Sequence, residues 1–88
     1  MIIAKGVRGP ASYATGGFLV RFGEVQQIQV SSGRMAGVMI ASSSNFTAKV
    51  VGASGNVVTI MVLTTSGTEV TNATDMSAQH FLVLADGY

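Results

Sequence analysis

The sequence predicts an all-β fold: a small antiparallel β-sandwich or barrel with an extended N-terminal arm. The first observation is residues 57–65, VVTIMVLTT, the longest run of β-branched and apolar residues in the chain. Val, Ile and Thr have stiff side chains that suit a pleated strand better than a helix. The other two observations are that short strand-like runs alternate with turn-forming residues, and that no long amphipathic helix interrupts them.

The predicted centre of the domain is an antiparallel hairpin over residues 46–66. A turn-rich pentapeptide, GASGN at 52–56, separates its two strands. Gly and Asn supply the positive φ angles that a tight reversal needs. Two strand-like runs joined by a short loop with Gly are typical of a β-hairpin.

The residues before the hairpin divide into an arm and the first part of the domain. We expect residues 1–10 to form an N-terminal arm that packs on a neighbouring chain or forms an edge strand, and residues 11–88 to form a single β domain. A loop at 11–17 ends at two glycines, and 18–22 is a strand with its aromatic residues on one face. After a break, we expect 25–30 to continue as a strand.

The remaining segments are shorter. Residues 34–41 show some helical spacing, but Gly37 and Ile40 favour a strand. A loop at 42–45 leads into the hairpin. Beyond it, we expect a short strand at 69–71, a capped helical turn at 74–79 and a last strand at 80–85.

The composition indicates a chain that works inside an assembly. It has 88 residues and no cysteine, so neither disulfides nor a cysteine-based zinc site can support its small core. Only 10% of the residues are charged, against roughly 25% in an ordinary soluble domain. The net charge of +1 gives no bias toward nucleic acid or an anionic membrane, and no run approaches the ~18 apolar residues of a membrane span.

Catalytic and metal-binding patterns are weak. His80 is the only histidine, and although Asp75, Ser77 and Asp86 are near it in sequence, there is no nucleophile elbow. The four carboxylates follow no metal-binding spacing. We therefore expect no enzyme activity, no metal and no cofactor.

A docking surface is expected instead. A long strand with low charge is prone to aggregate if its edge is free, so it should be interior or covered by a partner. We expect a homo-oligomer, a dimer or a trimer. The residues expected at interfaces are Met1, Ile2, Ile3, Lys5, Arg8 and Tyr13, with a lid over the core as the alternative for the tyrosine.

Three segments carry a resemblance. YATGGF at 13–18 followed by a strand, together with TDMS at 74–77 and the closing 81–87, resembles small structural proteins of tailed bacteriophages, such as capsid decoration (cement) proteins. The resemblance implies a non-enzymatic β domain, made in the host cytoplasm and present in many copies on the outside of the virion head. There it binds the major capsid protein and stabilises the shell, with the N-terminal arm lying across a neighbour.

Two other functions fit the same sequence. One is a component of the phage tail, baseplate or fibre. The other is a small nucleic-acid- or carbohydrate-binding β-barrel, for which Phe18 and Phe22 on either side of Arg21 are the best observation. Because the two rings alternate with the arginine, we expect them to face the core.

Overall fold

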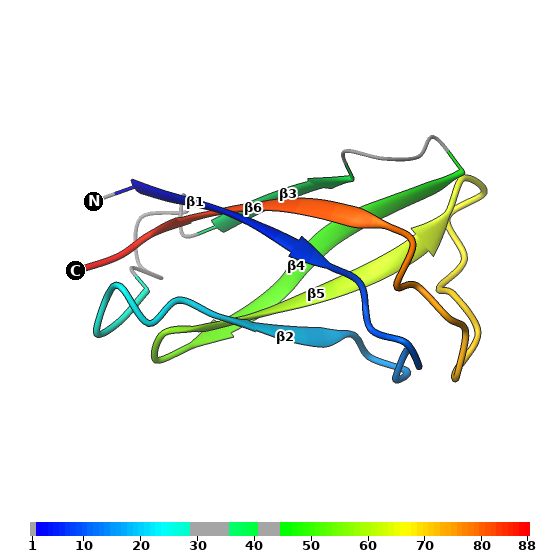
Figure 1. Ribbon diagram of the computed structural model, residues 1–88, viewed down its shortest axis with the longest axis horizontal. Helices are drawn as coiled ribbons and strands as arrows, with labels where there is room; N and C mark the ends of the chain where they lie inside the picture. The colour runs from blue at the N-terminus through cyan, green and yellow to red at the C-terminus, as the bar shows by residue number, and fades with distance from the viewer. Residues whose placement is uncertain (1, 29–35, 41–44) are drawn as a thin grey trace.

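The computed structural model describes residues 2–28, 36–40 and 45–88. Within these residues the chain forms two antiparallel sheets of three strands each, packed against one another (Figure 1). Sheet A has the order β1-β6-β3, and sheet B has the order β2-β5-β4. The strands are β1 (Ile2–Arg8), β2 (Phe18–Arg21), β3 (Ala36–Ile40), β4 (Phe46–Ser54), β5 (Val57–Thr64) and β6 (His80–Asp86). The predicted all-β antiparallel fold is confirmed.

The core lies between the sheets and follows the two-residue period of the strands. Every second residue of β5 is buried from Val58 to Val62, and every second residue of β6 is buried from Phe81 to Ala85. Phe18 of β2 meets Phe81 of β6 edge to face, with ring centroids 5.2 Å apart, and so joins the two sheets. The connecting segments close the ends of the core with Tyr13, Phe22, Val25, Ile28, Val70 and Met76.

The central hairpin is confirmed as β4 and β5, but its turn is shorter than expected. Ser54 pairs with Val57, so only Gly55 and Asn56 form the reversal. Gly55 has a φ of 60° whereas Asn56 has no positive φ, which is the pattern of a type II′ turn. The residues at 52–54, expected in the turn, belong to β4.

The extended N-terminal arm is not confirmed. Ile2–Arg8 forms β1, which pairs with β6 along its whole length, from Ile2 opposite Asp86 to Arg8 opposite His80. The physical reason is the alternation in the segment, because Ile3 and Val7 pack against the core while their neighbours face outward. The edge strand, which was the alternative for this segment, is what the structure shows.

Three shorter predictions also need correction. Residues 25–28 are irregular and not a strand, with an isolated bridge from Ile28 to Gly87. In the segment 74–79 the predicted cap is present, since the Asp75 carboxylate accepts from the N–H and the hydroxyl of Ser77. It leads into a single turn closed by the N–H of Gln79 on the carbonyl oxygen of Met76, and not into a helix. At 69–71 a single bridge replaces the short strand. The strand expected at 34–41 is confirmed over 36–40, and its ends, with 29–30 and the loop at 42–44, lie outside the described residues.

The two long sides of the molecule differ. Along one side β4 runs diagonally toward β3 and contacts it, without a hydrogen-bonded ladder between them among the described residues (Figure 1). Along the other side β1 and β2 are edge strands, and the side chain of Lys5 bridges them. The domain measures 33 × 20 × 20 Å, and its two broad surfaces are the outer faces of the sheets.

Candidate interaction surfaces

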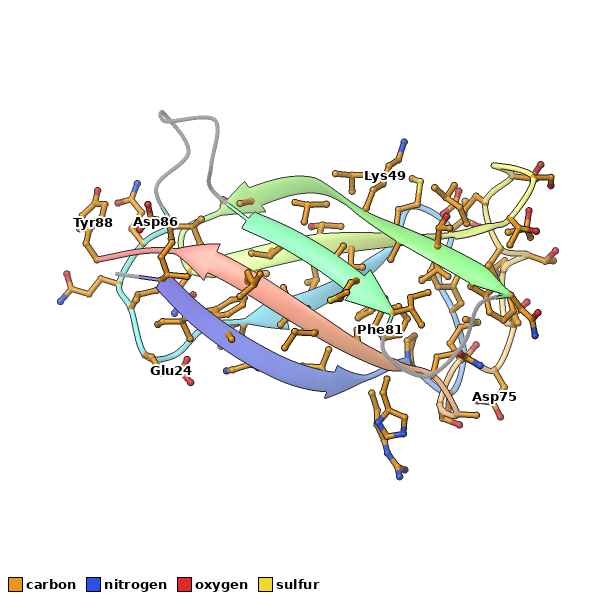
Figure 2. All side chains as sticks on the ribbon, turned by 90° about the horizontal axis from the view of Figure 1, so that it is seen from above. Glu24, Lys49, Asp75, Phe81, Asp86 and Tyr88 are labelled. Atoms are coloured by element: carbon orange, nitrogen blue, oxygen red, sulfur yellow. The ribbon has the colours of Figure 1, made fainter. Side chains whose placement is uncertain are left out.

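The outer face of sheet A, here called face A, has an apolar middle. The outward residues of β6 are Leu82 and Leu84, and the strand register places small or apolar residues on both sides of them. Met39 is 57% exposed and Leu84 is 41% exposed. Figure 2 looks onto this face. The middle of face A consists of Ala4, Gly6, Gly37, Met39, Leu82 and Leu84.

The charges of face A lie at its two ends. Arg8 pairs with His80 at one end of the ladder, and Ile2 pairs with Asp86 at the other. Figure 2 shows Asp86 at one end of β6, with Phe81, the neighbour of His80, toward the other. Face A therefore has a basic end, an uncharged middle and an acidic end.

The outer face of sheet B, here called face B, is apolar and basic. Leu19 on β2 is 69% exposed, and Val51 on β4 is 44% exposed. Arg21 and Lys49 face the same side, and the three strands of sheet B contain no carboxylate. This surface suits a partner that presents both apolar and acidic groups.

Lys5 lies on the side of the sandwich that is bordered by the edge strands β1 and β2. Its Nζ donates to the carbonyl oxygen of Arg21 at 2.9 Å and lies 3.3 Å from Oε1 of Glu24. The same ammonium group sits 5.2 Å from the centre of the buried Phe22 ring. A hydrogen bond from its own backbone, followed by the one from Lys5, lowers the pKa of Glu24. Lys5 thus ties β1 to β2 within this chain, and its expected contact with another chain stays a prediction.

Tyr13 connects two loops and the edge of sheet B. Its hydroxyl donates to Oε2 of Glu69 at 2.7 Å and accepts from the N–H of Val62 at 3.2 Å. The N–H of Gly16 also donates to Oε2 of Glu69, at 2.7 Å. These two hydrogen bonds, the one from Tyr13 first, lower the pKa of Glu69, while burial raises the pKa of Tyr13. We interpret this cluster as structural, because Tyr13 is only 1% exposed.

The predicted interface residues are thus dispersed. Ile2 is 67% exposed at the acidic end of face A, and Arg8 is exposed at its basic end. Ile3 points inward, and Met1 lies outside the described residues. Tyr13 is in the core, as the lid alternative expected, so it offers no surface for contact.

None of the four exposed apolar residues on the two faces was expected at an interface from the sequence. Leu19, Met39, Val51 and Leu84 are all substantially exposed. The signal was present in β6, where FLVL is apolar at odd and even positions, so that one set must point away from a single core. For Val51 the outward direction follows the alternation of β4, in which Thr47 and Lys49 also face out.

The aromatic rings near Arg21 face inward, as predicted. Phe22 is fully buried and Phe18 packs on Phe81, which removes the stacking surface that favoured a nucleic-acid-binding barrel.

In residues 2–28, 36–40 and 45–88, no group of three His, Asp or Glu side chains gathers to hold a metal ion. The same residues contain no helix that could cross a membrane. Comparison of the chain with family models, curated proteins and solved structures finds no match.

Proposed function

We propose that this chain is a virion structural protein that decorates the outside of the head of a tailed bacteriophage, binding the major capsid protein and stabilising the shell. The resemblance of 13–18 and 74–77 to capsid decoration proteins supports this function. One structural observation carries it: exposed apolar side chains lie on both outer faces of a charge-poor sandwich, such as Leu84 on face A and Leu19 on face B. A protein that holds a shell together must contact two neighbours at once, and two opposed apolar faces provide for that.

Face B is the surface that we assign to the shell. Its exposed Leu19 and Val51 supply apolar contact, and Arg21 and Lys49 supply positive charge. The matching coat surface is apolar with acidic groups around it. Each contact is small, but many copies on a closed lattice act together, so weak single contacts suffice.

The contact does not use a detached N-terminal arm. β1 is paired with β6 along its seven residues and contributes Ile3 and Val7 to the packing of the core. Withdrawing it to reach a neighbour would expose one edge of β6 and part of the core. The shell is therefore bound by the folded sandwich as a rigid body.

Co-sedimentation tests this function. The purified chain is mixed with head shells assembled from the major capsid protein encoded in the same genome, and bound protein is measured after centrifugation. We expect saturable binding that weakens with added salt, because part of the attraction is ionic. We expect Leu19→Glu to reduce the affinity by about tenfold or more, because it replaces an exposed apolar contact residue with a carboxylate that faces the acidic groups of the coat surface.

The matched control is Ala78→Glu, which adds the same charge at an exposed loop position outside the strands of both sheets. It should bind shells like the unaltered chain. A chain that does not sediment with shells at any concentration contradicts the proposed function, and binding to isolated tails instead would favour the tail component. Unchanged binding by Leu19→Glu contradicts the assignment of face B.

A further inference from the structure

We propose that face A pairs two copies of this chain, face to face, about a two-fold axis that crosses β6 near Val83. The strands of the two facing sheets then run antiparallel, with each β6 over the other. The inference goes beyond the proposed function, because pairing requires no shell. It leaves face B of each copy exposed on the outside of the pair.

The first argument is the surface chemistry of the middle of face A. Leu82 and Leu84 form a low ridge on β6, with Gly6 and Gly37 beside them. A methyl group added at either glycine would meet no atom within 4 Å, so the space next to the leucines is open. Sheets pack at about 10 Å when apolar side chains fill the gap between them, and this ridge is of that kind.

The second argument is the charge at the ends of the face. Reversal by the two-fold axis places the row of Arg8 and His80 against the partner's row of Ile2 and Asp86. A two-fold axis parallel to the strands would instead bring the basic ends of the two faces together, with Arg8 of both copies at the same end, and like charges repel. His80 and Asp86 each have an interaction within their own chain, so the complementarity concerns the sign of charge at each end of the face. The charges thus favour the antiparallel arrangement of two identical faces.

The third argument is area. A face of seven-residue strands in a three-stranded sheet is about 23 Å long and about 14 Å wide, which gives each copy a footprint of roughly 300 Å². Specific interfaces of standard size bury roughly 800 Å² per partner. The pair is therefore a weak, concentration-dependent dimer, and we expect the association to develop between about 10 µM and about 1 mM.

Sedimentation velocity over that concentration range tests the pairing. We expect the weight-average sedimentation coefficient of the unaltered chain to rise from the monomer toward the dimer value. Leu84→Glu should abolish the rise, because two facing copies bring two new carboxylates into the apolar middle of the interface. Leu19→Glu is the matched control on face B, where the side chain is even more exposed, and it should dimerise normally. Met39→Glu provides a second variant at an exposed position of face A.

Charge exchange tests the two-fold orientation. Arg8→Asp and Asp86→Arg should each reduce the association at least about fivefold, and the double variant should restore it. Circular dichroism and the urea midpoint of each variant establish that it is folded. A chain that stays monomeric up to 1 mM, or a dimer that survives both Leu84→Glu and Met39→Glu, overturns the pairing. A double variant no better than the single ones overturns the antiparallel arrangement.

Failure of the face A pairing can be told apart from failure of the proposed function. Leu84→Glu should still bind shells through face B while remaining monomeric, and Leu19→Glu should dimerise normally while binding shells about tenfold more weakly or worse. If the unaltered chain dimerises through face A but ignores shells, only the proposed function fails.

Discussion

At the scale of single residues, Tyr13 has the most defined role. β2 pairs with β5 only from Val57 to Ile60. The backbone N–H and carbonyl oxygen of Val62, further along the same edge of β5, therefore have no partner in β2. The hydroxyl of Tyr13 accepts from the N–H of Val62 at this point, and the N–H of Val70 donates to the carbonyl oxygen of Val62 at 3.0 Å. A side chain and a loop thus complete a ladder that the short strand leaves unfinished.

We predict that Tyr13→Phe lowers the free energy of unfolding by about 1–3 kcal/mol, because it leaves the buried N–H of Val62 without its acceptor. Urea denaturation measures the change. Tyr88→Phe is the matched control, since that ring is 62% exposed and its loss of a hydroxyl should leave the midpoint unchanged. Equal midpoints for Tyr13→Phe and the unaltered chain would contradict the structural role of the hydroxyl.

The same variant has a pH signature. The hydrogen bond from Tyr13 is the main cause that holds the pKa of Glu69 below its ordinary value of 4.5. A lowered pKa of a carboxyl group stabilises the folded state above the ordinary value, and that contribution is lost as pH falls through the lowered pKa. The difference in stability between the unaltered chain and Tyr13→Phe should therefore be larger at pH 7 than near pH 3.

At the scale of elements, the entry into β2 depends on two adjacent glycines. Gly16 and Gly17 have φ angles of 101° and 121°, which side-chain-bearing residues rarely adopt. Their surroundings differ. A methyl group at Gly16 would meet nothing within 4 Å, whereas one at Gly17 would collide with the backbone carbonyl oxygen of Ile60. The second glycine thus permits β2 to approach β5 closely enough to pair with it.

We predict that Gly16→Ala costs about 1–2 kcal/mol of stability through backbone strain alone. Gly17→Ala should cost roughly twice as much, because the added methyl group also displaces the strand beside it. Chemical denaturation of the two variants side by side gives the comparison, and each serves as the control for the other. Equal losses would show that the close approach at Ile60 contributes nothing.

At the scale of the whole molecule, the sandwich is closed by segments that are distant in the sequence. Sheet A combines β1 from the beginning of the chain, β3 from its middle and β6 from its end. Each sheet buries its inner face only against the other, so neither is expected to persist alone. β1 matters in this respect because it covers one edge of β6 and supplies Lys5, which bridges to sheet B.

We predict that deleting residues 1–8 unfolds the domain. The physical reason is the loss of the β1–β6 ladder together with the side chains of Ile3 and Val7 that pack on the core. Far-UV circular dichroism and amide chemical-shift dispersion measure the outcome. Deletion of Met1 alone is the control and should leave the domain folded. A folded domain after the longer deletion would restore the detached arm expected from the sequence.

The strand segments of the central hairpin, of β2 and of β6 could be predicted from the sequence, because each depends on local properties. β-Branched residues favour strands wherever they occur, and alternation assigns Val20 to the core and Leu19 to the surface. The outer faces could have been predicted in part, from the apolar residues at both parities of β6. The roles of Lys5 and Tyr13 could not, since each is set by a partner at least sixteen residues away.

Antiparallel strands and a surface poor in charge follow from the local sequence of this chain. Which strand edges pair with one another depends on its three-dimensional fold. The bulge between Val50 and Gly52 shifts the alternation of β4 by one residue, so that Ala53 packs inward although Lys49 and Val51, at the same parity, face out. Strand identity is a property of neighbouring residues, but register and pairing are fixed by contacts between distant ones, where a shift of one residue exchanges the buried and exposed faces.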